Sequence, residues 1–408
     1  MLTLFLTGIF FGLEGFCEMK RKLIFSFSVS SLSRSACHIP HESLLRRNRN
    51  RVAKMLSEIP NATQRFILIT DDTLCRKFGM STDNCYWFDH TTNTTLKGRN
   101  YLVLVLLDTH TGQCFPLSVV LLYGKKHKEH KPRLEELKKE LLILKEHGLS
   151  SFTLSADSWF AASELFEWLD SNGFDFEIEI KKNRKITYLD KKQLGVIGEK
   201  GKMKYPSIHD VVMSMNWRNT TYSGGAPKKT NSGIIRLFGS PLRLKFTAVW
   251  NQHDSKDTSP FAIYITNKTS RRASRIWALS RFRWSIECHF RASKQSFSFD
   301  KFATHSSQTA LKLIVLGMFL ISSLELQRSY PNAKPADKKT IRSKIEPIEK
   351  YVKKIRIEHE NKSYMRTLVQ TTAREKAINH IKTVRNKSFV CLKPRDKIKT
   401  GDQLDNAA

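Results

Sequence analysis

Three acidic residues stand where the chain could bring carboxylates together for phosphoryl-transfer chemistry. Asp71 and Asp157 each follow a short run that reads as a buried strand, and Glu287 lies in the stretch 281–297, whose apolar residues recur at helical spacing. Hard divalent cations take oxygen ligands, and Mg²⁺ is the usual case. Two such ions would activate a hydroxyl and stabilise the leaving oxygen of a phosphodiester. The candidate cofactor is therefore a pair of Mg²⁺ ions, for which Mn²⁺ can substitute.

The stretch 281–297 also places cations beside its carboxylate. At about 100° per residue, Arg283, Glu287 and Lys294 fall within about 40° of one another, next to the apolar side of the helix. Charges at the edge of a buried face are costly unless they are paired or used. The stripe has two interpretations. It is either an arginine–glutamate pair beside a solvated lysine, or a catalytic acid flanked by phosphate-binding cations.

The charge balance indicates a polyanionic partner. The chain has 408 residues, with 69 Lys+Arg against 38 Asp+Glu and a formal net charge of +31. Such an excess of positive charge destabilises the folded chain by self-repulsion. Its usual function is to bind a polyanion, and nucleic acid is a more common partner than a membrane surface. Arg46 and Arg47 lie in a basic amphipathic helix predicted over 41–56, and they are candidates for contacts to DNA phosphates.

Cysteine usage and hydropathy argue against a disulfide framework, a structural zinc site and a membrane span. The seven cysteines are scattered, odd in number and without a C-x-x-C pair, as expected of reduced thiols in the cytoplasm. The cluster Cys37-His38-x-x-His41 lacks a second pair of ligands. The apolar stretches 2–16 and 309–326 are both interrupted by charges, and we predict that they are buried helices.

The order of strands and helices predicts an α/β fold built on a mixed sheet. Asp71 and Asp157 follow strands that are separated by the lysine-rich helix 131–147. Ligands of open α/β sheets bind at strand ends where the connections diverge. We predict five segments. The first is a helical N-terminal DNA-binding region (1–60), and the last is a basic helical C-terminal region (329–408). Between them lie the first part of the catalytic core (61–181), a β-rich insertion (182–259) and the second part of the core (260–328).

Two short motifs resemble those of the DDE transposases of bacterial and archaeal insertion sequences, specifically the insertion-sequence-four-like group. Asp71-Asp72-Thr73 is similar to the motif of the first acid, and Ala-Asp-Ser-Trp-Phe at 156–160 is similar to that of the second. Periodicity does not choose between Asp71 and Asp72, because both faces of the preceding strand are apolar. The family pattern of an acid, one residue and Ser or Thr selects Asp71.

A third motif carries the resemblance further. The third acid of this group lies in a motif of Tyr, two residues, Arg, three residues, Glu, six residues and Lys. Arg283, Glu287 and Lys294 match that spacing, and Ser280 stands at the tyrosine position. The resemblance covers roughly residues 60–300, and this family also carries a β insertion between its second and third acids.

The resemblance implies a ribonuclease-H-like core in which Asp71, Asp157 and Glu287 are the catalytic and metal-binding residues. Arg283 and Lys294 would hold phosphates of the transposon end. The implied function is metal-dependent cut-and-paste excision and strand transfer of an insertion sequence, through nicking, joining and a hairpin intermediate. A homodimer would act on paired terminal inverted repeats and target DNA, in the prokaryotic cytoplasm at the nucleoid.

A hairpin intermediate requires an aromatic residue on which an extruded base can stack. Relatives that form hairpins stack an extruded base on an aromatic side chain of the β insertion. Trp250 is the first candidate for that DNA contact and Trp217 is the second. The alternative for both residues is ordinary packing within a strand.

Two other functions fit the same residues. One is an inactive or domesticated relative that binds DNA without cutting it, because Ser280 removes a hydroxyl that would contact phosphate at longer reach. The other is a ribonuclease-H-like nuclease without strand transfer. A relative that only binds DNA gives no cleavage products, which distinguishes it from a transposase. A nuclease without strand transfer gives cleavage products but no joined products.

Overall fold

A computed structural model of the chain describes most of its residues. The described residues are 2–13, 16–23, 28–77, 85–89, 93–190, 192–197, 202–216, 218–220, 228–250, 259–302, 304, 306–329 and 348–361. Of the predicted C-terminal region, the helix α12 (Ile348–Asn361) is described, and the residues after it lie outside the described part.

The centre of the fold is a mixed sheet of five strands. β3 lies antiparallel between β1 and β4, and β1, β5 and β6 run parallel to one another. Their order across the sheet is β4 (Cys114–Leu122), β3 (Thr94–Asp108), β1 (Phe66–Arg76), β5 (Thr153–Ala156) and β6 (Phe176–Glu179). β2 (Cys85–Asp89) pairs with the first part of β3.

The sequence of β1 explains its burial and its length. Residues 66–70 are buried on both faces, as a near-continuous apolar run predicts. The strand does not end there, because β1 stays paired with β3 as far as Arg76. The expectation that Asp71 follows the strand is therefore wrong, and Asp71 lies inside it. Asp157, by contrast, comes directly after β5, as predicted.

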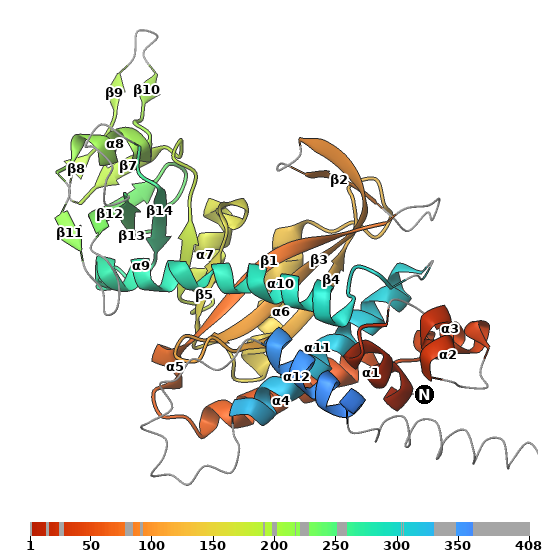
Figure 1. Cartoon of the computed structure of the whole chain (residues 1–408). Helices are drawn as coiled ribbons and strands as arrows, with labels where there is room; N and C mark the ends of the chain where they lie inside the picture. The colour runs from red at the N-terminus through yellow and green to blue at the C-terminus, as the bar shows by residue number, and fades with distance from the viewer. Residues whose placement is uncertain are drawn as a thin grey trace, which may run out of the picture.

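The predicted β-rich insertion continues the same sheet. β14 (Ala262–Thr266) pairs with β6 on one side and with β13 on the other, which joins both parts into one sheet that has 12 strands among the described residues. Figure 1 shows these strands at one end of the molecule, with a two-stranded hairpin projecting beyond them. The insertion contains β7 (Ile186–Leu189), β8 (Lys192–Gln193), α8 (Ile208–Ser214), β11 (Arg218–Thr220), β12 (Lys228–Leu237) and β13 (Leu244–Val249), and its hairpin is β9 (Val196–Ile197) with β10 (Met203–Lys204).

Helices cover both faces of the core sheet. The apolar sides of α6 (Arg133–Glu146) and α7 (Ser163–Ser171) pack on one face. The other face is covered by α9 (Ala273–Phe282), α10 (Trp284–Phe297) and α11 (Ser307–Ser329). Figure 1 shows α9 and α10 running end to end across the sheet, from the insertion to the core. These two helices connect the insertion to the core face.

The helices of the predicted N-terminal region pack into the core. One apolar cluster is shared by α10, α11 and three N-terminal helices, namely α1 (Leu2–Phe10), α2 (Phe16–Leu23) and α3 (Val29–Cys37). Helix α4 (His41–Ser57) lies along β4, and the short helix α5 (Ala62–Arg65) follows it in the chain. In α4, Asn48 and Arg49 donate to the carbonyls of Pro116 and Leu117. An edge strand needs such cover, because its backbone groups are otherwise open to pairing.

Helix α11 is long and apolar enough to cross a membrane by length and composition. In the structure, 67% of that stretch is buried within the fold. Leu313, Val315, Leu316 and Ile321 contact the same apolar cluster as α1 and α10. The prediction that 309–326 is a core helix is confirmed.

Candidate active site

The register of the parallel strands sets acidic residues side by side. Thr70 of β1 is paired with Ala156 of β5, and Ala156 is paired with Ile178 of β6. The residue that follows each of these three is an acid, namely Asp71 within β1, Asp157 directly after β5, and Glu179 at the end of β6. Residues at matching positions on neighbouring strands point to the same face. The three carboxylates therefore form a row across the face of the sheet on which α9 and α10 lie.

Arg283 links this row to Glu287. Its Nη1 lies 3.9 Å from Oδ2 of Asp71 and 3.6 Å from Oε1 of Glu287. The arginine–glutamate pair of the first interpretation is present, and the same guanidinium also reaches the acid row. We expected one continuous helix over 281–297, but it is interrupted at Arg283. There the N–H of Arg283 donates to the Ser280 carbonyl, and the N–H of Ile286 donates to the Arg283 carbonyl. These i→i−3 hydrogen bonds replace the i→i−4 bonds of an α-helix.

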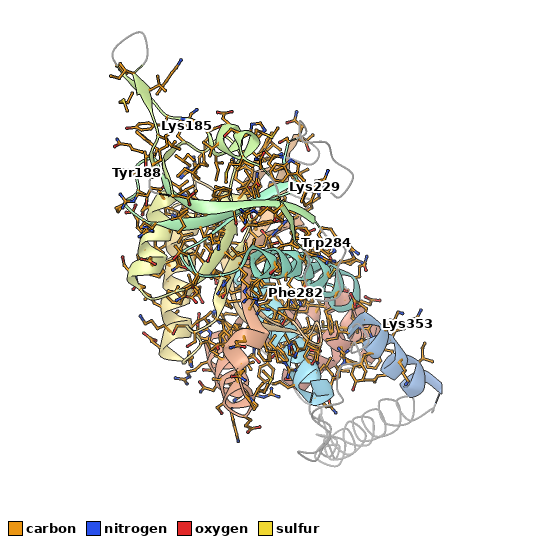
Figure 2. The ribbon with its side chains drawn as sticks, turned by 90° about the vertical axis from the view of Figure 1, so that its left-hand side faces the viewer. Lys185, Tyr188, Lys229, Phe282, Trp284 and Lys353 are labelled. Carbon is orange, nitrogen blue, oxygen red and sulfur yellow. The ribbon has the colours of Figure 1, made fainter. Side chains whose placement is uncertain are left out.

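The break in the helix leaves large side chains on either side of Arg283. Figure 2 labels these two residues, Phe282 and Trp284. Trp284 is 54% exposed although it adjoins the acid site. An exposed indole next to Arg283 in the chain is available for contact with a ligand.

The acids perturb one another's protonation. Burial, with the charges of Asp72 and Asp157, raises the pKa of Asp71 to about 7, although Arg283 and the backbone N–H of Asp72 oppose the shift. Burial also raises the pKa of Glu287 and of Glu179, and Asp157 adds to both shifts while Arg283 opposes them. Clusters of shifted carboxylates are typical of sites that bind cations or transfer protons.

The structure separates the adjacent acids Asp71 and Asp72. Successive side chains of a strand point to opposite faces, and Asp71 points toward Arg283. Asp72 points to the opposite face, where its Oδ2 lies 3.1 Å from Nη2 of Arg133 in α6 and accepts a bond from Asn100. Asp71 is therefore the acid of this adjacent pair that faces Arg283, whereas Asp72 pairs with side chains of α6 and β3.

Lys294 contacts β1 directly. Its Nζ donates to the Leu74 carbonyl at 3.0 Å, three residues along the strand from Asp71. This bond fastens α10 to β1, so Lys294 has a positioning role in addition to any contact with phosphate.

Ser280, at the tyrosine position of the motif, is a buried residue of α9. Its Oγ donates to the Trp277 carbonyl at 2.8 Å. It also forms a side-chain hydrogen bond with Tyr264, whose phenol pKa is raised chiefly by burial and by Glu179. Tyr264 is paired with Glu179 across β14 and β6. The site thus contains a tyrosine hydroxyl, supplied by a strand in place of the helix.

Trp250, the first predicted DNA-contacting aromatic, does not line the site. Trp250 is 1% exposed and packs in the core with the residues of β13, so it has no face available for a base, and that prediction is wrong. Trp217 lies outside the described residues. Packing in a strand, the alternative reading, is what the structure shows for Trp250.

The predicted basic helix is partly structural. Arg46 and Arg47 are exposed on α4 and stay candidates for phosphate contacts. Arg49 is buried and pairs with Glu140 at 3.0 Å, and Arg51 donates to Ser323 at 2.7 Å. Half of this arginine cluster therefore joins α4 to its neighbours in the fold.

Sequence reasoning missed Glu179 and Trp159. The alternation Phe-Glu-Ile-Glu-Ile at 176–180 was the available signal for Glu179, because it indicates a strand with one polar face. Trp159 follows Asp157 by two residues, is 50% exposed, and has Nζ of Lys181 4.6 Å from its ring centroid.

The donor set suits a hard divalent cation. Among the described residues, no group of three or more His, Cys, Asp or Glu side chains is already drawn together tightly enough to hold a metal ion. Burial is the main cause of the raised pKa of Asp71, and the neighbouring charges of Asp72 and Asp157 add to it while Arg283 opposes it. Carboxylate oxygens and an excess of negative charge fit Mg²⁺ or Mn²⁺.

Comparison with protein families identifies the class of the chain. The model of the transposase DDE domain matches residues 67–323, a segment that contains the entire acid row and Glu287. The chain belongs to the transposase DDE domain family.

Curated proteins and solved structures were compared as well. No curated protein matches the chain. Among solved structures, the chain is similar to the piggyBac transposase in its synaptic complex with hairpin DNA, at 12% identity and a TM-score of 0.38. The match covers 66% of this chain and 50% of that one, so it spans half the length of the piggyBac chain.

Proposed function

We propose that the protein is a DNA transposase of the insertion-sequence-four-like group, which excises an insertion sequence and joins it to target DNA. The observation that carries the proposal is the row of Asp71 and Asp157 on neighbouring parallel strands, bridged to Glu287 by Arg283. The strand order β4-β3-β1-β5-β6, with three antiparallel strands followed by two parallel ones, supports a ribonuclease-H-like core.

The proposed roles follow from the positions of the side chains. Asp71, Asp157 and Glu287 would hold two Mg²⁺ or Mn²⁺ ions, which polarise the scissile phosphodiester and activate the attacking hydroxyl. Arg283 balances the carboxylates and is placed to contact a phosphate of the transposon end. The buried hydroxyl of Tyr264 beside Ser280 and Glu179 would orient those groups, in place of a tyrosine at position 280.

DNA is the proposed partner. A net charge of +31 supports binding to phosphates, with Arg283, Lys294, Arg46 and Arg47 as named contributors. Paired terminal inverted repeats require two active sites, so a homodimer is the proposed assembly. The proposed location is the prokaryotic cytoplasm, where the DNA lies.

The first prediction tests the chemistry apart from the affinity. Asp157→Asn and Glu287→Gln are expected to abolish Mg²⁺-dependent cleavage and to leave DNA binding within a few-fold of wild type, because basic groups supply the affinity. The substrate is a supercoiled plasmid that carries the ends of the element, assayed in parallel by gel shift. Glu58→Gln, an exposed change at the end of α4, serves as the matched control.

Three outcomes contradict the proposal in different ways. If cleavage persists in Asp157→Asn, then the site assignment is wrong. A wild-type protein that shifts the DNA and never cuts it is a binding relative. Cleavage without any joined product identifies a nuclease that lacks strand transfer.

A further inference from the structure

Two cavities beside the acid row form one continuous depression. The first, of about 410 Å³, is lined by Ser158, Glu179, Lys182 and the start of β14. The second, of about 640 Å³, reaches from Ser163 to Phe238 in the insertion. Lys181 and Asn183 line both cavities, and we call this depression the 181–185 groove. It begins next to Asp157 and leads away from it.

The walls of the 181–185 groove are basic. Lys181, Lys182, Arg184 and Lys185 come from the connection between β6 and β7. Figure 2 shows Lys185 in the insertion, below the projecting hairpin. Nζ of Lys182 and Nη2 of Arg184 each donate at 2.8 Å to a serine hydroxyl, which orients the cation without neutralising its charge.

Two acids border the 181–185 groove, and neither cancels its charge. Glu179 lies at the end nearest the catalytic acids. Glu164 lines the second cavity and pairs at 2.8 Å with Lys138, which lies outside the groove lining. Four cations therefore face two carboxylates, one of which has its own counterion.

An exposed aromatic ring lies at each end of the 181–185 groove. Trp159, next to Ser158, is 50% exposed, and Lys181 lies over its ring. Phe238, at the far end, is 58% exposed and packs against Tyr205, with a distance of 5.2 Å between ring centroids. Its backbone N–H donates to the Lys185 carbonyl, which holds the ring beside the cations. Rings held at a basic track are stacking platforms for nucleotide bases.

We propose that the 181–185 groove binds an unpaired DNA strand next to the scissile phosphodiester, with bases stacked on Trp159 and Phe238 and phosphates on Lys181 and Lys185. This inference rests on the proposed function, because it assigns the strand that the acid row would cut. An unpaired strand fits better than a duplex, since only unpaired bases present their faces to a ring, whereas a duplex keeps its bases stacked on one another.

The test measures binding of a fluorescein-labelled oligothymidylate of about 12 nucleotides by fluorescence anisotropy, without divalent metal. Trp159→Ala and Phe238→Ala are each expected to weaken binding by about 5-fold to 150-fold, the range for loss of one base–aromatic stack. Trp159→Phe retains a ring and should restore most of the affinity. Lys181→Ala should lower the slope of log affinity against log salt by about 0.7, the value for one phosphate contact of a single strand.

The control is Tyr86→Ala, which removes a ring that is 69% exposed on β2, outside the 181–185 groove. Its affinity should equal that of wild type. The inference is overturned if Tyr86→Ala weakens binding as much as Trp159→Ala, if neither groove variant changes the affinity, or if duplex DNA competes as well as the single strand. If the variants bind as expected but the protein never cleaves DNA, then the proposed function is refuted. The inference that the 181–185 groove binds single-stranded DNA would still hold.

Discussion

At the scale of single residues, the central feature is an arginine shared between carboxylates of different elements. Arg283 contacts Asp71 on β1 and Glu287 on its own helix. Spacing along the helix predicted its neighbour Glu287, because residues four apart share a face. No sequence pattern predicted the contact with Asp71, because that distance depends on how α10 crosses the sheet.

The second prediction concerns the adjacent acids. Asp71→Asn is expected to eliminate cleavage, because Asp71 points toward Arg283 and the acid row. Asp72→Asn should retain at least about a tenth of the activity, because Asp72 pairs with Arg133 on the opposite face, and a partly exposed pair contributes roughly 1 kcal/mol or less. Cleavage of the plasmid substrate by equal amounts of the two folded variants checks the order. The reverse order would reassign the first acid and leave the rest of the site unchanged.

At the scale of elements, the site depends on how α9 is anchored to β6. Glu177 of β6 is fully buried, and Oε2 lies 3.6 Å from Nη1 of Arg271, which precedes α9. Burial raises the pKa of Glu177 well above its ordinary value, although Arg271 and Arg275 oppose that shift. This ion pair fixes the start of the α9–α10 pair and therefore the place where Arg283 meets the acids.

The third prediction tests that anchor. Arg271→Met is expected to destabilise the fold by roughly 3 kcal/mol at pH 8, because it leaves a buried carboxylate without its nearest counterion. The loss should be smaller at pH 5, where a protonated Glu177 needs no counterion. Chemical denaturation at both pH values measures this, with Arg272→Met, at an exposed neighbouring position, as the control. Equal losses for the two variants would show that the pair does not anchor α9.

The fourth prediction uses Glu325 of α11, which accepts from Gln113 at 2.8 Å and pairs with Arg328 at 2.9 Å. Burial raises its pKa to about 7 from 4.5. The folded protein therefore keeps a proton that the unfolded chain releases. This contribution to stability is complete below about pH 4.5 and is lost as the pH rises to about 7, by up to about 1.36 kcal/mol per pH unit.

Glu325→Gln should remove this component. The free energy of unfolding of the variant should fall less than that of wild type between pH 5 and pH 8, whatever its absolute value. Urea denaturation at both pH values gives the comparison, and the exposed Glu129→Gln is expected to follow wild type. Parallel pH profiles for wild type and Glu325→Gln would contradict the assignment.

At the scale of the whole molecule, the N-terminal helices are part of the core. Arg356 of α12 donates to the Phe10 carbonyl at 2.7 Å, and Ser298 donates to the Gly12 carbonyl at 2.8 Å. The end of α1 is therefore held by residues from the second half of the chain. The change from helical to strand patterns near residue 60 predicted a separate N-terminal region, but local patterns do not reveal which distant helices will cover an apolar face.

The fifth prediction removes residues 1–27, which contain α1 and α2. Five apolar side chains of this segment are nearly fully buried, namely Phe5, Ile9, Leu13, Phe16 and Met19. Burial of each is worth about 1.5–3 kcal/mol, and the sum approaches the whole stability of a typical domain. The truncated chain should lose cooperative thermal unfolding by circular dichroism, whereas Lys20→Ala should not. A truncated protein that melts at the wild-type temperature would make this segment a separable unit.

Much of the architecture follows from the sequence because periodicity and burial are local signals. The core helix at 309–326 and the strand that ends just before Asp157 were predictable in this way. The end of β1 was not, since Asp71 and Asp72 interrupt an apolar run while pairing with β3 continues. Glu179 and the 181–185 groove depend on strand register, which a single sequence does not specify.

The pairing of β14 with both β6 and β13 has a consequence for the open edge of the core sheet. β6 pairs with β5 on one side and with β14 on the other, so a core that lacked β14 would have β6 as an edge strand. An edge strand presents unpaired N–H and C=O groups that can pair with another chain. The strands of the insertion therefore protect the core sheet, next to Glu179, from pairing with a second molecule.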